Sequence, residues 1–440
     1  GVYSLSRRAS STTPASFLLC GAKIVFFDLI HNYFASTISI FFLYLYKTIS
    51  SMTQLKTENR VVWVDWMRVA ACLMVIIVHA TEPFYLGGEG AQILTEADAY
   101  WSSFFDSIVR ACVPLFIVAS SYLQFPLHYS SGEYLRRRAV RILVPFILWS
   151  VVYALAWGEP TENFQNLLLN FNYAAGHLWF VYMLIGLYLL MPLLSPWAER
   201  VGKRELQVYL AIWAFTTLIP HIREVVAGGF EGMKFIYGVS GLPRAAQTPL
   251  WGEAGWNTYG TFYYISGFVG YLLMGLYFRR FVGELSWKKS LAIAIPSYLV
   301  GFVIVFGGFL RRVFEMTQGV FPVEGLVEKA MWWETTWCND TVGVALMTVA
   351  WILLFKKIKS DGAFYQRVLL PVSKASYGTY LLHLLVLVPI CNLFREWLGV
   401  GLDGKLGIWT SPVALLGFVA SAAIAVVLQK IPKIGKYIVG

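Results

Sequence analysis

Apolar runs of near-membrane length alternate with short polar segments from about residue 61 to the end of the chain. A transmembrane helix needs about 20 residues to cross the hydrocarbon core of a bilayer. The pattern therefore predicts an all-α integral membrane protein, a polytopic bundle of about ten transmembrane helices. The predicted spans are residues 61–81, 103–124, 139–157, 177–197, 206–221, 261–281, 289–309, 339–356, 375–395 and 408–429.

Composition agrees with lipid as the main solvent. Hydrophobic residues make up 58% of the 440 residues and charged residues 14%, whereas soluble domains carry about 25% charged residues. No soluble module interrupts the apolar runs, so we expect residues 52–440 to form one membrane domain. Two predicted spans are less regular, because 206–221 is short and 103–124 contains Asp106 and Arg110.

Residues 1–51 stand apart from this domain. The sequence begins with Gly1, and an apolar stretch at 16–46 is interrupted by charged residues. This stretch is compatible with an extra helix or with a signal-like segment. We favour a third interpretation, in which translation starts at Met52 and the preceding residues are absent from the working protein.

Charge sets the expected orientation. Lys and Arg cluster in every second connection between predicted spans, whereas connections 82–102 and 158–176 contain neither. Because cytoplasmic loops carry an excess of Lys and Arg, we expect both termini on the cytoplasmic side. The net charge of +10 then belongs to loops that face anionic membrane lipid, and no nucleic-acid partner is expected. The five cysteines have no metal-ligand spacing, so we expect no metal site and no disulfide framework.

The first predicted span contains ionisable residues, which mark candidate functional sites inside a membrane. Arg68 and His79 are eleven positions apart, so both lie on one helical face, separated by about 16 Å along the axis. Glu82 is placed to orient the imidazole or to stabilise its charged form. His79 is then a packed core histidine, a proton-relay group of a transporter or a general base, and periodicity does not choose among these.

A second cluster holds Arg136, Arg137, Arg138 and Arg141, four arginines in six positions at the cytoplasmic entry of the third predicted span. Topology alone accounts for one or two arginines there. Guanidinium groups also match phosphate oxygens, so a site for a phosphate-bearing ligand from the cytoplasm is the alternative. Both interpretations stay open.

Three further polar residues are candidate substrate-binding residues. His177 opens the fourth predicted span on the outer side, and Asp340 begins the eighth at a depth near that of His79. His383 lies near the middle of the ninth and is expected to face the bundle interior. The long outer connections 221–260 and 310–338 are rich in aromatic residues, which fit a belt at the membrane interface or, alternatively, a surface on which a sugar stacks.

Taken together, these segments resemble the acyltransferase-3 family of integral membrane O-acyltransferases, in its stand-alone type without a fused extracytoplasmic domain. The resemblance covers most of residues 61–430 in order and spacing. The features that carry it are Arg68-x10-His79, Arg138-x-x-Arg141, HLWFVYMLIGLYLLMPLL at 177–194 and SYGTYLLHLLVL at 376–387.

The resemblance implies an enzyme of the bacterial cytoplasmic membrane that moves an acyl group, usually acetyl, from cytoplasmic acyl-CoA to a hydroxyl. The expected acceptor is a cell-surface glycan or a glycolipid, the co-substrate is acetyl-CoA or a related acyl-CoA, and no metal is implied. On this analogy Arg68 and His79 are the essential pair, with Glu82 beside them, and Arg138 and Arg141 lie on the acyl-donor side.

The rival interpretation is a proton-coupled secondary transporter or flippase of envelope saccharide, with Arg68, His79 and Glu82 as a relay. We find no paired inverted repeats and no matched broken helices, which such transporters often show. The G-x-S-x-G pattern of serine esterases is also missing. A non-catalytic scaffold would leave the buried charges unexplained. The oligomeric state is not determined by the sequence.

Overall fold

The structure is a computed structural model that describes residues 60–85, 93–157, 160–169, 173–226, 251–252, 259–322, 333–398 and 405–440. The expected start at Met52 lies outside these residues. In the described part of the chain every regular element is a helix, and η labels short π or 3-10 segments. The elements are α2 (Val62–Tyr85), α3 (Glu96–Val109), α4 (Cys112–Gln124), α5 (Ser131–Arg138), η1 (Ala139–Leu143), α6 (Val144–Ala156), α7 (Pro160–Leu169), η2 (Tyr173–Leu178), α8 (Trp179–Arg200), α9 (Lys203–Thr216), α10 (Ile219–Val226), η3 (Gly260–Ile265), α12 (Val269–Arg280), α13 (Trp287–Thr317), η4 (Glu334–Trp337), α15 (Val342–Phe355), η5 (Tyr365–Leu369), α16 (Leu370–Lys374), α17 (Ser376–Leu398), α18 (Leu406–Gln429) and α19 (Gly435–Ile438).

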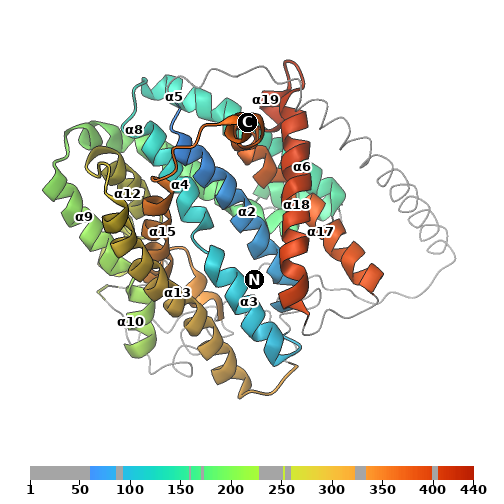
Figure 1. Cartoon of the computed structure of the whole chain (residues 1–440). Coiled ribbons are helices and arrows are strands. Elements are labelled where there is room, and N and C mark those ends of the chain that lie inside the picture. The colour runs from blue at the N-terminus through green and yellow to red at the C-terminus, as the bar shows by residue number, and fades with distance from the viewer. Residues whose placement is uncertain are drawn as a thin grey trace.

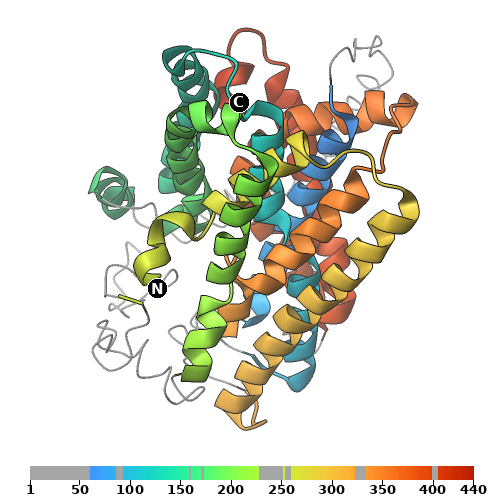
Figure 2. The ribbon, with the colours of Figure 1, turned by 90° about the vertical axis from the view of Figure 1, so that its left-hand side faces the viewer.

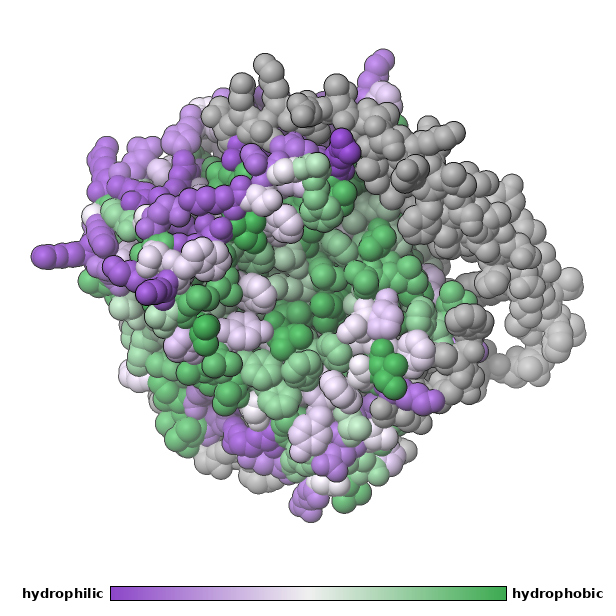
Figure 3. Space-filling view, in the orientation of Figure 1, coloured by the Kyte–Doolittle hydropathy of each residue, from purple (hydrophilic) through white to green (hydrophobic). Residues whose placement is uncertain are grey.

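Among the described residues, eight helical stretches are long and apolar enough to cross a membrane. They are α2, α3–α4, α5–η1–α6, η2–α8, α13, η4–α15, α17 and α18. A broad band of hydrophobic side chains separates two more hydrophilic ends of the molecule (Figure 3). The chain is therefore an all-α, multi-pass membrane protein, as the hydropathy pattern predicts.

The two remaining predicted spans, 206–221 and 261–281, are helical but interrupted. A short turn separates α9 from α10, and Figure 2 shows the two, in green, as consecutive segments of one rod. The second, α12, has 12 residues and follows the 3-10 segment η3. It packs against α4 and α9. These segments therefore belong to the bundle although neither is an unbroken helix of membrane length.

Helix α2 occupies the middle of the bundle, where it packs against α3, α4, α17 and α18 (Figure 1). The short helices α5 and α19 lie at one end of the molecule, and α10 lies at the other. Close packing elsewhere depends on small residues, since a Cβ added to Gly301 of α13 would come 2.5 Å from the backbone oxygen of Gly343. This arrangement lets α2 present residues to both ends of the bundle.

The charged residues in predicted span 103–124 are neutralised inside the bundle. Asp106 is paired with Arg110 and accepts a hydrogen bond of 3.2 Å from Thr81 of α2. The Arg110 guanidinium also lies 4.5 Å from the ring centre of Trp337. Because a buried charge without a partner is costly, this pairing explains how the span tolerates both residues.

The aromatic outer connections do not all lie at the surface. Trp333 and Trp337 are buried, and Trp337 stacks on Phe309 with 3.9 Å between the ring centres. These two residues belong to the core, so they form neither an interface belt nor an exposed sugar platform. Trp251 is 44% exposed, and Trp256 lies outside the described residues.

Candidate active site

A cavity of about 710 Å³ lies at the end of the bundle that carries α5 and α19. Its walls come from α2, α4, α5, η1, α8 and the beginning of α17. No acidic side chain among the described residues lines it. The basic residues that line it are Arg60, Arg68, Arg136, Arg137, Arg138, Arg141, Lys374 and Lys436. The cavity is therefore built to attract a polyanion.

One wall contains the predicted arginine cluster. Helix α5 ends at Arg138, and the π-helical turn η1 continues it, so both Arg138 and Arg141 line the cavity. The Arg138 guanidinium lies over the rings of Tyr134 and Tyr188, at 5.3 and 5.2 Å from their centres. Its buried Nε has no hydrogen-bond partner in the described structure. A buried guanidinium nitrogen without a partner is available to an anionic ligand.

Arg137 is held differently from its neighbour. Its side chain pairs with Glu133 one turn earlier on α5, and its guanidinium lies 4.1 Å from the ring centre of Tyr129. Both members of this ion pair are about 40% exposed, at 41% and 39%. Arg137 therefore contributes a partly neutralised charge to the rim, and Arg138 and Arg141 carry more of the positive potential.

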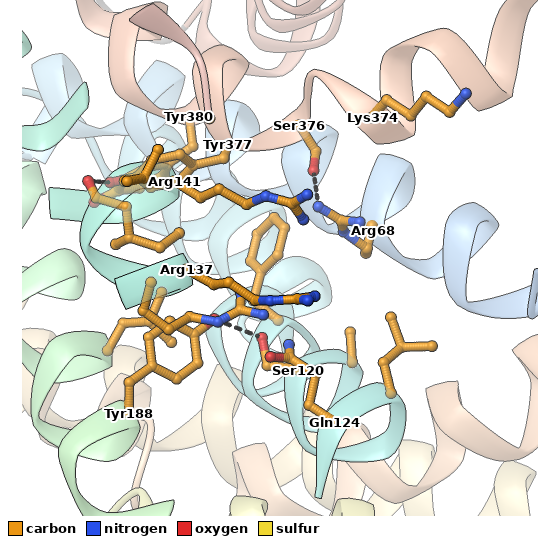
Figure 4. Close-up of a pocket in the computed structure, with 18 of the residues that line it drawn as sticks. Arg68, Ser120, Gln124, Arg137, Arg141, Tyr188, Lys374, Ser376, Tyr377 and Tyr380 are labelled. Atoms are coloured by element: carbon orange, nitrogen blue, oxygen red, sulfur yellow. Dashed lines mark hydrogen bonds between the residues drawn. The ribbon is translucent and has the colours of Figure 1, made fainter. Parts of the chain in front are cut away.

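The opposite wall comes from α2 and the junction of α16 with α17. Nη2 of Arg68 donates a hydrogen bond of 2.8 Å to Oγ of Ser376, and Arg68 and Arg141 extend toward each other across the cavity (Figure 4). Lys374 lies on the same wall. Burial lowers the pKa of Lys374 below that of an ordinary lysine, and the nearby Arg60 lowers this pKa further. The lining is thus crowded with positive charge.

Three histidines gather beyond the inner end of the cavity. Tyr380 lines the cavity, donates its hydroxyl to the backbone oxygen of His177, and lies one turn before His383 on α17. The ring centre of His383 is 5.0 Å from that of His79 and 5.0 Å from that of His177. His79 and His177 are 6.1 Å apart. The packing of α2, η2 and α17 therefore brings together three predicted residues that are far apart in sequence.

Hydrogen bonding fixes the tautomer of His383. Its Nδ1 lies 2.5 Å from the backbone oxygen of Tyr380. A carbonyl oxygen only accepts, so Nδ1 carries the proton and Nε2 is left as an acceptor. Nε2 is buried and has no partner among the described residues. The cluster thus contains a buried nitrogen that is able to accept a hydrogen bond.

The Nδ1 nitrogen of His79 lies beside a carboxylate. Its Nδ1 lies 2.9 Å from Oε2 of Glu82, one turn further along α2. The two side chains are 13% and 23% exposed, so the pair is neither fully solvated nor fully buried. With the carboxylate beside Nδ1, Nε2 is the nitrogen left to take a proton.

Asp340 lies outside the histidine cluster. Its carboxylate accepts a hydrogen bond from Tyr259, and the neighbouring Asn339 accepts one of 2.5 Å from Tyr271. No contact in the described ranges joins Asp340 to His79. In those ranges there is also no group of three or more His, Cys, Asp or Glu side chains that could hold a metal ion.

Several lining residues were not singled out from sequence. Arg60, Lys374 and Lys436 look like ordinary cytoplasmic-loop charges, because nothing local distinguishes a lining cation from a solvated one. Tyr380 was missed as well. Its position three residues before His383, one turn away on the same helix, was the available signal.

Comparison with known proteins agrees with this picture. The profile of the acyltransferase-3 family, described as an acyltransferase domain, matches residues 61–430. No curated protein and no solved structure gave a match. The matched region includes α2 with Arg68 and His79, the arginine wall and all three clustered histidines. Since the match spans most of the chain, the protein belongs to the acyltransferase-3 family of membrane acyltransferases.

Proposed function

We propose that the protein transfers an acetyl group, or another short acyl group, from cytoplasmic acyl-CoA to a hydroxyl of a cell-surface glycan or lipid-linked saccharide. The proposal places it in a bacterial cytoplasmic membrane. One observation supports it above the others, namely that a cavity lined by eight basic residues and no described acidic one adjoins a cluster of three histidines. A transporter interpretation is disfavoured by the family.

The donor would bind with its phosphates in the cavity. CoA carries several phosphate charges, and guanidinium groups bind phosphate oxygens in pairs. Arg68 and His79 are separated by about 16 Å along α2, a distance suited to the long uncharged pantetheine arm. The thioester would then pass Tyr380 and reach the histidines, while the nucleotide stays between Arg138, Arg141 and Arg68.

The acceptor hydroxyl would lose its proton to Nε2 of His79, with Glu82 stabilising the imidazolium that forms. The oxygen then attacks the thioester carbonyl carbon, the carbon–sulfur bond breaks, and the sulfur of CoA leaves with the electron pair. The proton on His79 is returned to that sulfur, so the products are an ester and free CoA. His383, whose Nε2 has no partner among the described residues, would accept a hydrogen bond from a second hydroxyl of the acceptor.

The test uses purified protein in proteoliposomes, with radiolabelled acetyl-CoA and a glycan extract from the native envelope. We expect equal amounts of label transferred and CoA released, and we expect His79→Ala to abolish both without reducing membrane insertion. Transfer that persists in the variant would remove His79 from the mechanism. Glycan movement without any CoA release would contradict acyl transfer. Mass spectrometry of envelope glycans with and without the gene would then identify the acceptor.

A further inference from the structure

Asp65 lies one turn before Arg68 on α2, and four hydrogen bonds saturate its carboxylate. Arg60 donates from Nε and Nη2 at 3.0 and 2.6 Å, Tyr365 donates its hydroxyl at 2.7 Å, and Ser373 donates its hydroxyl at 2.6 Å. Each carboxylate oxygen accepts two of these bonds, which is its full capacity. Asp65 is only 3% exposed and does not line the cavity.

The partners of Asp65 connect it to the cavity wall. Arg60 lines the cavity itself, and Ser373 immediately precedes Lys374, which also does. A second contact runs parallel to the first, since Arg68 bonds Ser376 three residues after Ser373. Lys374 therefore lies between two fixed serines, each held by a residue of α2. The hydrogen bonds of Asp65 are therefore made outside the cavity, whereas the charged groups that they orient line it.

We propose that Asp65 is a positioning residue for the acyl donor, a role that rests on the proposed function. It holds Arg60 and the segment carrying Lys374 so that their charges face the cavity, opposite Arg138 and Arg141. Arg60 uses two of its five N–H groups on Asp65, which leaves other N–H groups for a phosphate. The donor phosphates would then be held between two preorganised basic walls.

A simple electrostatic account predicts the opposite effect. A carboxylate near an anion site repels the anion, so removing its charge should tighten binding if Asp65 acted only through its field. If Asp65 acts by positioning, removing it should weaken binding, because Arg60 and Lys374 lose their fixed orientation. The sign of the change therefore separates the two accounts.

The probe is CoA itself, measured by calorimetry on the purified full-length chain in detergent. We expect Asp65→Asn to weaken CoA binding about tenfold or more, as loss of charge-assisted contacts does. Asp361→Asn is the matched control, since Asp361 is exposed and does not line the cavity; it should leave affinity unchanged. Unchanged or tighter binding by Asp65→Asn would overturn the proposal.

A double-mutant cycle with Arg60→Gln tests whether Asp65 acts through its partner. We expect the Asp65→Asn, Arg60→Gln double variant to lose clearly less affinity than the two single losses multiplied together. Losses that multiply fully would contradict action through Arg60. A role confined to stability would lower the melting temperature without weakening CoA binding in the folded fraction.

Tyr365→Phe covers the case in which Asp65→Asn does not fold. This variant keeps every formal charge, so an electrostatic account predicts no change in affinity. We expect about threefold weaker CoA binding from the loss of one hydrogen bond behind the wall; wild-type affinity would overturn the proposal. Wild-type protein that binds no CoA would refute the proposed donor as well, whereas wild-type binding with unaffected variants would refute only the role of Asp65.

Discussion

Replacing Glu82 by glutamine would remove one negative charge beside His79 and keep a side chain of nearly the same size. The Oε2 atom of Glu82 lies 2.9 Å from Nδ1 of His79, and the amide oxygen of glutamine would occupy the same place without the charge. The substitution therefore tests the charge of Glu82 rather than its shape. If His79 becomes protonated during acyl transfer, the variant stabilises that state less.

The magnitude follows from Coulomb's law. Opposite unit charges separated by 2.9 Å attract by about 6 kcal/mol at an effective dielectric constant of about 20, and by about 1.4 kcal/mol at about 80. The side chains of His79 and Glu82 are 13% and 23% exposed, so we expect an intermediate value of about 2–3 kcal/mol. At about 1.36 kcal/mol per tenfold, kcat should fall by about 30-fold to 160-fold.

The assay is steady-state transfer of label from acetyl-CoA in proteoliposomes, with kcat and the KM for acetyl-CoA determined separately. Glu82 does not line the donor cavity, so this KM should stay within about twofold while kcat falls. Glu162→Gln is the control, because Glu162 is exposed on α7. A kcat for Glu82→Gln within twofold of wild type would refute the charge argument. A change confined to KM would move Glu82 from the reaction to donor binding.

Two further predictions concern the donor cavity. Arg138→Gln combined with Arg141→Gln should weaken CoA binding about a hundredfold and make the remaining binding less sensitive to salt. The control Arg367→Gln, at an exposed position, should change neither property. Wild-type affinity in the double variant would mean that the two arginines only set the membrane topology. Burial and the charge of Arg60 lower the pKa of Lys374 from its ordinary value of 10.5, and only the protonated amine attracts phosphate. CoA affinity should therefore begin to fall at a lower pH than the 10.5 at which an ordinary lysine titrates, and should keep falling as the pH rises. Lys374→Arg should abolish that fall, and the same pH dependence in that variant would show that another group titrates.

Helical periodicity predicts the relation between residues of one helix. Arg68, His79 and Glu82 all belong to α2, and their placement follows from 3.6 residues per turn. The structure puts Arg68 at the cavity and His79 against Glu82. The arginine wall was predictable in the same way, because Arg138 and Arg141 are one turn apart. Local geometry was sufficient for these residues.

The meeting of three histidines was not predictable from one sequence. It depends on how α2, the short segment η2 and α17 pack, and no local pattern encodes that packing. Asp340 shows the same limit in the other direction. Its depth in the membrane resembled that of His79, yet it accepts a hydrogen bond from Tyr259, because depth leaves the position around the bundle undefined. Trp333 and Trp337 likewise look like interface residues until the stacking on Phe309 is seen.

The stretch of α2 between Arg68 and His79 explains why the nucleotide and the acyl group of the donor would occupy different places. The ten residues between Arg68 and His79 carry no Asp, Glu, Lys or Arg, and several of them are buried. Moving a phosphate along such a surface is costly, because charged groups are disfavoured inside a membrane. The pantetheine arm and its thioester are uncharged and do not meet this cost. On the proposed function, the charged nucleotide would therefore stay at the basic cavity while the acyl group alone reaches His79.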